Sequence, residues 1–167
     1  MRHWRLTLLF SLAVAAGVIM YYFMTGSGEE GKIRKTLTTL TANISKPSEE
    51  GPIVLAAKAQ TLENLFDERC GLEIPGCPIN GSYSPQEISS NAVQIRSQFV
   101  SIRLEFLDVS VVIQEKDKAA GRFTARFEGR LKHGGDVAEI REATCALVKK
   151  GGRWLFADFK AIETLRK

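Results

Sequence analysis

Apolar residues recur at helical spacing near the start of the folded part of the chain. In the first segment they lie three or four residues apart, which predicts a helix over about residues 30–45. A second segment begins at Pro52, which suits the first turn of a helix, and is expected to end near Gly71. The apolar faces of the two helices consist of Ile33, Leu37, Leu40 and Ile44, and of Leu55, Ala59, Leu62 and Phe66.

The sequence SPQE predicts the start of a third helix. Ser84 is suited to the N-cap, Pro85 to the first helical position, and Glu87 to the far side of a capping box. The apolar stripe that follows is Ile88, Ala92, Ile95, Phe99 and Ile102. We therefore expect this helix to run from Pro85 to about residue 102.

Beyond residue 102 the apolar period changes from about 3.6 to 2, which predicts β-strands. The glycine pair in HGGD predicts a tight hairpin in which His133 pairs with Asp136. That register aligns two complementary charge pairs: Arg130 with Glu139, and Glu128 with Arg141.

A second glycine pair, Gly151-Gly152, predicts a hairpin between the last two strands, with Lys150 opposite Arg153. The same register pairs Val148 with Leu155, Ala146 with Ala157, and Thr144 with Phe159. We therefore expect four-stranded antiparallel pairing to fill most of the C-terminal half.

The two registers divide the strand residues between two faces. One face is expected to pack against the helices: Phe123, Ala125, Phe127, Leu131, Ala138, Ile140, Ala146, Val148, Leu155, Ala157, Phe159, Ala161 and Leu165. The other face carries arginines beside an apolar group that we expect to form an interface: Leu147, Trp154, Phe156 and Ile162. The expected partner is a second copy of the chain or another envelope protein. The alternative is that Trp154 is an ordinary exposed residue at a strand end.

The N-terminus predicts a membrane anchor. Residues 1–5 are basic, and residues 6–24 form a run of 19 residues without a charge. As a helix this run is about 28 Å long, close to the hydrocarbon thickness of a bilayer. Tyr21 and Tyr22 suit its far interface, and the positive end is expected to stay in the cytoplasm. The alternative is a signal peptide cleaved after Ala13-Val14-Ala15.

These signals predict a single-pass inner-membrane protein with an uncleaved signal-anchor. Residues 1–5 form the cytoplasmic tail, 6–24 the transmembrane helix and 25–31 a linker. Residues 32–167 form one extracytoplasmic domain, which is periplasmic if the source is bacterial.

Charge and cysteine content narrow the function classes. Arg2 and Arg5 precede the apolar run, so the rest of the chain carries 21 basic and 19 acidic residues. The sequence has no basic stripe with interleaved aromatic residues, so we do not expect it to bind nucleic acid. Cys70 and Cys77 bracket a turn-rich loop, and a disulfide between them would stabilise the fold by about 2.5 kcal/mol. Free thiols are the alternative. Neither histidine lies near the cysteines, so we predict no metal site and no cofactor.

Three helices followed by a long antiparallel meander resembles the order of elements in the nuclear transport factor 2-like (NTF2-like) superfamily. The sequence KKGGRWLF also resembles the Gly-x-Trp-x-aliphatic signature that opens the last strand in many SnoaL-like members. The resemblance covers about residues 30–166. It implies an α+β fold with a cone-like, strongly bent sheet around the helices, often with an internal pocket and dimers formed through the sheet. An anchored domain of this kind also looks like the periplasmic assembly-factor domains of type IV secretion systems.

If the predicted register holds, the pocket is lined by Phe127, Ile140, Glu142, Thr144, Phe159 and Glu163. Glu142 falls beside Ala161 with Glu163 diagonal to it, and neighbouring buried carboxylates raise one another's pKa, which makes Glu142 a weak candidate base. The resemblance implies Asp, His or Tyr in the pockets of the family's isomerases and dehydratases. Here His133 falls in a turn, Asp108 and Asp158 on the outer face, and Tyr83 stands alone.

Because the expected pocket lacks the Asp, His or Tyr residues of the family's enzymes, we predict a non-catalytic module that binds a small apolar ligand or a protein. The first alternative is a SnoaL-like isomerase or hydrolyase with a carboxylate base in the cone. The second is a structural component of an envelope secretion machine.

Overall fold

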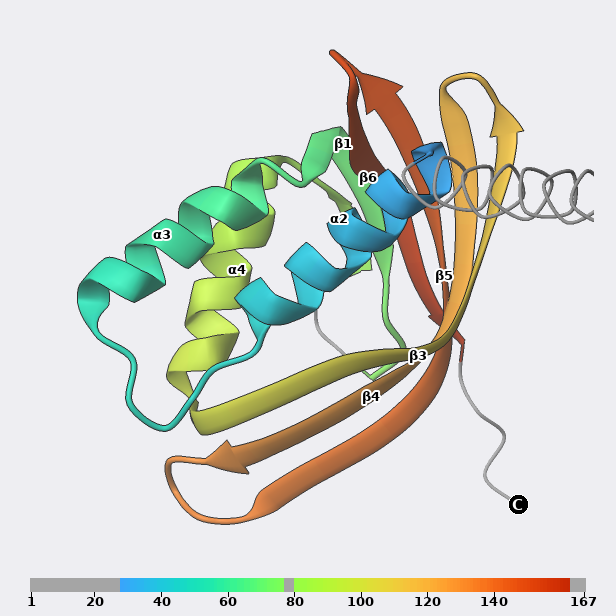
Figure 1. The fold of residues 1–167 in the computed structure, drawn as a ribbon. Helices are drawn as coiled ribbons and strands as arrows, with labels where there is room; N and C mark the ends of the chain where they lie inside the picture. Colours follow the sequence, from blue (N-terminus) through green and yellow to red (C-terminus); the bar gives the residue numbers. More distant parts are fainter. Residues whose placement is uncertain (1–27, 77–79, 163–167) are drawn as a thin grey trace, which may run out of the picture.

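The computed structural model describes residues 28–76 and 80–162, which form three helices on one face of a six-stranded sheet (Figure 1). The helices are α2 (Glu29–Ile44), α3 (Pro52–Glu63) and α4 (Pro85–Ser97). The strands are β1 (Phe66–Glu73), β2 (Asn80–Tyr83), β3 (Phe99–Glu115), β4 (Lys118–Leu131), β5 (Asp136–Lys150) and β6 (Arg153–Ile162). This is the α+β architecture expected from the sequence. The proposed anchor and linker up to residue 27 lie outside the described residues, among which no helix is long and apolar enough to cross a membrane.

The sheet has the order β2-β1-β6-β5-β4-β3, and β1 with β6 is its parallel pair. The strands bend strongly, so that β3 and β4 pass beneath the helices (Figure 1). We call the side of the sheet that the helices cover the concave face. Its residues include Leu104, Phe106, Phe123, Ala125, Phe127, Arg141, Cys145, Leu147, Trp154, Phe156 and Phe159.

The third helix begins as predicted. The Ser84 hydroxyl accepts a hydrogen bond from the Glu87 backbone N–H at 3.3 Å, and the Ser84 N–H donates to the Glu87 carboxylate at 2.7 Å. This capping box satisfies two N–H groups at the helix start. The helix ends at Ser97, however, and the last two residues of its predicted stripe, Phe99 and Ile102, belong to β3.

The second helix is shorter than predicted. It ends at Glu63, and Phe66 starts β1 instead of extending the helix toward Gly71. The reason is tertiary: β1 fits between β2 and β6, where Phe66 lies opposite Phe156. A parallel partner some ninety residues away leaves no local mark on the sequence.

The predicted register of the β4–β5 hairpin is wrong. Arg130 lies opposite Asp136, so residues 132–135 form a longer loop than the predicted two-residue turn. Gly134 and Gly135 both adopt positive φ, at 89° and 99°, which suits this wider loop. The change in register is an odd number of residues, so the two faces of β5 are exchanged relative to those of β4. On β5 the concave face carries Glu139, Arg141, Ala143, Cys145 and Leu147, not the predicted Ala138, Ile140, Ala146 and Val148.

The predicted β5–β6 register is correct only near its turn. Lys150 pairs with Arg153 and Val148 with Leu155, as expected. A β-bulge at Ala157 then pairs Ala146 with Asp158 and Thr144 with Lys160, not with the predicted Ala157 and Phe159. Because of this extra residue, the aromatic residues on both sides of the bulge, Phe156 and Phe159, face the helices.

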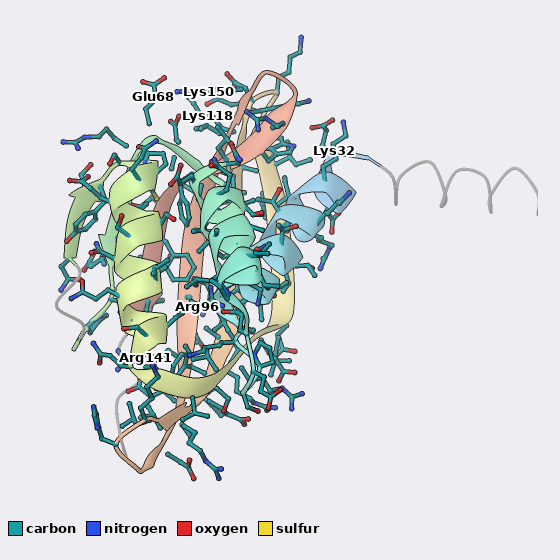
Figure 2. The ribbon with its side chains drawn as sticks, turned by 90° about the vertical axis from the view of Figure 1, so that its left-hand side faces the viewer. Lys32, Glu68, Arg96, Lys118, Arg141 and Lys150 are labelled. Atoms are coloured by element: carbon teal, nitrogen blue, oxygen red, sulfur yellow. The ribbon has the colours of Figure 1, made fainter. Side chains whose placement is uncertain are left out.

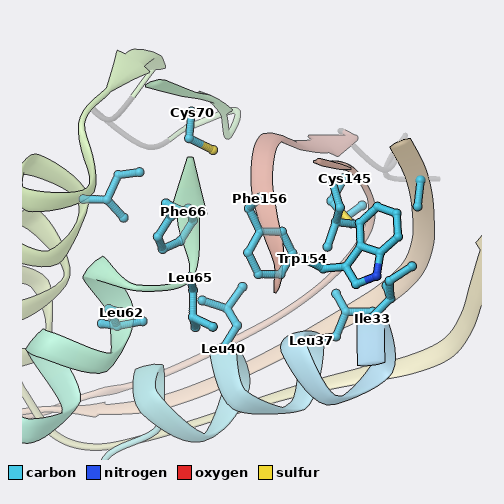
Figure 3. Close-up of a cluster of buried hydrophobic side chains, with 14 of the residues drawn as sticks. Ile33, Leu37, Leu40, Leu62, Leu65, Phe66, Cys70, Cys145, Trp154 and Phe156 are labelled. Atoms are coloured by element: carbon cyan, nitrogen blue, oxygen red, sulfur yellow. The ribbon is translucent and has the colours of Figure 1, made fainter. Parts of the chain in front are cut away.

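The core lies between the helices and the upper half of the concave face (Figure 3). Its buried residues include Ile33, Leu37 and Leu40 of α2, Leu62, Leu65 and Phe66 at the end of α3 and start of β1, and Leu147, Trp154 and Phe156 of the last two strands. Ile33 and Phe156 are both 0% exposed, so α2 is packed tightly onto the sheet.

Candidate functional site

The concave face holds a group of three phenylalanine rings in contact with one another, and a separate pair. The ring centroid of Phe106 lies 4.1 Å from that of Phe123, and Phe159 lies 5.8 Å from Phe123. Phe123 is buried, whereas Phe106 and Phe159 are half-buried and pack against the core. A fourth ring, Phe127, is also half-buried and packs edge-on against Phe99 at 5.7 Å. The predicted concave placement of Phe127 and Phe159 is therefore confirmed.

Irregularities in the strands bring these rings together. In β3 the register shifts between Leu107 and Ser110, where Asp108 has a positive φ of 53°. This shift lets Phe106 face the helices while Val109 and Val111, farther along the same strand, also pack on the core. In a strand that alternates without a bulge, Leu107 would share the face of Val109, and Phe106 would lie on the opposite face.

Arg141 is a charged residue on the concave face. It lies directly opposite Ala125, and Ala125 lies opposite Phe106 on the next strand. The guanidinium donates from Nη1 to the Pro75 carbonyl at 2.6 Å and from Nε to Glu139 Oε2 at 2.9 Å. Its side chain is 25% exposed (Figure 2). The predicted register placed Arg141 on the opposite face, so this residue was missed.

Three of the predicted pocket residues lie on the other side of the sheet, which we call the convex face. Ile140 is 58% exposed, and Thr144 and Glu142 share its face. The Glu142 carboxylate is exposed and forms an ion pair with Arg122 at 2.6 Å. The prediction that Glu142 lies in the cone is therefore wrong, because the β4–β5 register differs from the predicted one. The sixth predicted residue, Glu163, lies outside the described residues.

The predicted interface residues are mostly in the core. Leu147, Trp154 and Phe156 are buried, with Trp154 only 3% exposed, so their placement on an exposed face is wrong. Ile162 does lie on the convex face and is 41% exposed. The β4–β5 register accounts for the exchange of Leu147, Trp154 and Phe156, and the bulge at Ala157 returns Ile162 to the convex face.

Trp154 is held by the first residue of α2. Its indole Nε1 donates to Glu29 Oε2 at 2.7 Å, and Lys149 Nζ lies 2.7 Å from the same oxygen. Hydrogen bonds from Lys149, Lys32 and Trp154 lower the pKa of Glu29 to about 2. The carboxylate therefore ties the start of α2 to the β5–β6 hairpin across the neutral pH range.

Two cysteine thiols are buried beside the aromatic group. Cys70 and Cys145 are free thiols, and burial raises the pKa of each to about 12. Thiols of this kind are poor nucleophiles at neutral pH. Cys77, the predicted disulfide partner of Cys70, lies outside the described residues. Within the described part of the chain, no three His, Cys, Asp or Glu side chains group closely enough to hold a metal ion.

A second polar cluster is buried away from the aromatic rings. Arg96, at the end of α4, and Glu50, in the α2–α3 connection, are each 2% exposed, and Arg96 Nη2 lies 2.6 Å from Glu50 Oε2. Lys58 lies 2.9 Å from the same carboxylate. Burial acts to raise the pKa of Glu50, but the two cations outweigh it, and the pKa lies below its usual value. Among the residues that the structure describes, Arg96 Nε and Nη1 are buried without a hydrogen-bond partner. The cluster fastens the α2–α3 connection to α4, the helix that carries Arg96 (Figure 2).

Comparison with solved structures identifies the fold. The crystal structure of a proposed scytalone dehydratase from Novosphingobium aromaticivorans has a TM-score of 0.67 and 16% identity, with 82% of this chain and 85% of that chain covered. A proposed dehydratase of the NTF2-like family from Streptomyces avermitilis has a TM-score of 0.64 and 15% identity, covering 83% and 98%. The chain has the NTF2-like fold.

A third structural neighbour has a different described role. It is a proposed calcium/calmodulin-dependent protein kinase II association domain from Xanthomonas campestris, with a TM-score of 0.64, 14% identity and coverage of 85% and 92%. No protein-family model matches the sequence, and no curated protein matches it. Identities of this size show a shared NTF2-like fold, and the activities of the neighbours remain statements about those proteins.

Proposed function

We propose that this protein is a non-catalytic binding module whose concave face holds a small, largely apolar ligand. The observation that carries the proposal is that the rings of Phe106, Phe127 and Phe159 are only half-buried and offer apolar surface on the side of the sheet that the NTF2-like fold encloses. Burying the remaining area of these rings against a ligand is favourable by roughly 25 cal/mol per Å² of apolar surface.

Chemical-shift mapping with a neutral aromatic probe, 2-naphthamide, tests the proposal. We expect shifts at Phe106, Ala125 and Phe159 on the concave face and none at Thr144 or Lys160 on the convex face. Absence of binding at millimolar probe, or shifts confined to the convex face, would contradict a ligand site at the aromatic rings.

The second candidate function is an isomerase or hydrolyase that acts on the same face. Two of the structural neighbours are described as proposed dehydratases, which favours this reading. Proton transfer would need a carboxylate on the concave face, and Glu139 is placed there whereas Glu142 is not. If the protein is such an enzyme, Glu139→Gln should abolish turnover and Glu142→Gln should leave it unchanged.

We also propose that the module forms a homodimer through its convex face. Ile140 and Ile162 are diagonal neighbours there and are 58% and 41% exposed, and a neighbour with the same fold is described as an association domain. Light scattering on the purified protein should report a dimer that Ile140→Lys dissociates. The control is Ile53→Lys on α3, which is exposed outside the sheet and should leave the mass unchanged.

The uncharged run of residues 6–24 supports the proposal that the module is anchored in the inner membrane with its domain outside the cytoplasm. Alkaline extraction of membranes should leave the full-length chain in the pellet. Release of the chain into the supernatant would argue for cleavage or for a different location.

A further inference from the structure

We propose that the end of the domain formed by the β3–β4 and β5–β6 turns docks on the lipid bilayer, and that Val112 and Ile113 insert among the headgroups. We call this end, residues 112–118 and 149–153, the turn end. The inference rests on the proposed membrane anchoring and adds to it a second contact between the protein and the membrane.

The turn end lies beside the start of α2, where the chain enters the domain. The Lys149 backbone N–H donates to the Asp117 carbonyl at 2.8 Å, which joins the two turns. Glu29, the first residue of α2, accepts from the Trp154 indole at 2.7 Å and lies 2.7 Å from Lys149 Nζ. Figure 2 shows one lysine from each of these segments at the same end of the molecule: Lys32, Lys118 and Lys150.

The sequence leaves little distance between this end and a bilayer. Only residues 25–28 separate the uncharged run from Glu29. The five backbone steps from residue 24 to Glu29 span at most about 18 Å. The headgroup layer on one side of a bilayer is about 5–8 Å thick. With residues 6–24 across the membrane, the start of α2 and the turn end beside it therefore lie within reach of the headgroups.

Two large apolar side chains are exposed at the turn end. Val112 is 58% exposed and Ile113 is 46% exposed. Ile113 follows Val111 on the concave face and lies opposite Ala119, whereas Val112 lies on the convex face. The end of the β3–β4 ribbon is therefore apolar on both of its faces. Moving this surface out of water is favourable in proportion to its area, and the bilayer is the apolar phase within reach.

The charges of the turn end suit the headgroup layer without requiring anionic lipid. Lys118 lies 3.2 Å from Glu115, and Lys150 lies 2.6 Å from Asp67. Because these charges are paired, little net charge is left to attract anionic lipid. Exposed lysines can also lay their apolar stems beside the inserted residues and keep their ammonium groups at the level of the lipid phosphates. We therefore expect docking to depend on Val112 and Ile113 and not on lipid charge.

Methyl NMR on the full-length chain in phosphatidylcholine nanodiscs tests the inference. A gadolinium chelate on a fraction of the headgroups speeds the relaxation of methyl groups near the bilayer, and nanodiscs without gadolinium are the blank. The distant reporter is Ile53, which is 85% exposed on α3 and lies beside the end of α2, where Lys58 Nζ donates to the Ser45 carbonyl at 2.7 Å. We expect the enhancement at Ile113 to exceed that at Ile53 at least about fivefold, since α2 alone separates the two ends by about 24 Å.

The anchor alone brings the turn end near the bilayer, so a variant must isolate the docking. Replacing both apolar residues, Val112→Asn with Ile113→Asn, should lower the enhancement at Val148 at least about twofold, because the transfer of apolar surface is lost. Val148 lies opposite Lys118 at the same end and is not changed by the substitution. If this double variant fails to fold, Val112→Asn alone makes the same test on the more exposed of the two residues.

The matched control is Ile53→Asn with Val54→Asn. It removes an exposed Ile and Val at the other end of α2 and should leave the enhancement at Val148 unchanged. The methyl shifts of the buried Ile33 and Leu147 report whether each variant keeps the fold. Adding phosphatidylglycerol to the nanodiscs should also leave the enhancement in the wild type unchanged.

The failures of the docking and of the anchoring are distinguishable. If the chain stays in the nanodiscs and the enhancement at Val148 is the same with and without Val112 and Ile113, the docking is overturned while the anchoring stands. An enhancement that depends on phosphatidylglycerol would overturn docking through the apolar residues in favour of an electrostatic contact. If the full-length chain does not co-purify with nanodiscs, the anchoring proposal fails, and the docking fails with it.

Discussion

Removing the charge of Glu50 should strongly destabilise the domain. Its carboxylate accepts from Arg96 Nη2 at 2.6 and 2.8 Å and lies 2.9 Å from Lys58 Nζ. Both Glu50 and Arg96 have only 2% of the side chain exposed. In Glu50→Gln the guanidinium keeps its charge but loses its counter-ion in a place that water does not reach.

The expected cost follows from that geometry. Breaking a buried ion pair by removing one partner costs about 3–5 kcal/mol, because an uncompensated charge stays buried. Within the described part of the chain, Arg96 has no other acceptor that could replace the Glu50 carboxylate: its Nε and Nη1 atoms have no partner, and its Nη2 bonds to Ser45 O at 3.4 Å besides Glu50. Against a total stability of about 5–15 kcal/mol, such a loss amounts to a large fraction of the whole.

Urea unfolding of the wild type and Glu50→Gln measures this loss. The control is Glu115→Gln, which breaks an exposed ion pair with Lys118 at 3.2 Å and should cost no more than about 1 kcal/mol. The double variant Glu50→Gln, Arg96→Met removes both charges and should recover much of the stability. If Glu50→Gln costs no more than Glu115→Gln, then the buried cluster does not hold the α2–α3 connection to α4.

Two further predictions concern a close contact and a pH-sensitive one. Gly129→Ala would place a Cβ 2.7 Å from the Phe99 ring, so we expect thermal unfolding to show a loss of stability of about 1–3 kcal/mol. In the control Gly51→Ala the Cβ meets nothing within 4 Å, and the loss of stability should be under about 1 kcal/mol. Equal losses in the two variants would refute the clash. Because the pKa of Glu29 is lowered to about 2, its contacts stabilise the fold above the ordinary carboxyl pKa and are lost as the pH falls toward 2. In a Trp4→Phe chain, the fluorescence of Trp154 should therefore change at acidic pH, and Glu29→Gln should produce that change at neutral pH; a spectrum independent of pH would count against the contact.

The elements whose signals are local could be predicted from the sequence. The capping box at Ser84 and Glu87 marks the start of α4 because both hydrogen bonds form within four residues. The Gly151-Gly152 turn likewise predicts the pairing of Lys150 with Arg153, since a two-residue loop leaves no other register beside it. Both signals act over a few residues, which is the range where side-chain chemistry dictates the backbone.

The faces of β5 and the site could not be predicted for the opposite reason. The two glycines of HGGD suit a two-residue turn and a four-residue loop equally well, so they do not fix the β4–β5 register. Charge complementarity does not fix it either, because charged residues on β4 and β5 can form opposite-charge pairs in both registers. Arg130 finds Asp136 instead of Glu139, and with that shift Arg141 moves to the concave face. The bulge at Ala157 is stabilised by burying Phe156 and Phe159 together, a tertiary gain that alternation along the strand cannot indicate.

The strand order has a consequence for biosynthesis. β6 lies between β1 and β5, although it is the last of the described strands to leave the ribosome. Until it does, the β1–β2 ribbon and the β3–β4–β5 meander have no strand to join them, and each exposes an edge that could pair with another chain. A chain that ends before about residue 153 would therefore carry two sheet segments with unpaired edges. Such edges can pair with other chains, so we expect a truncated chain to be a substrate for chaperones and quality-control proteases.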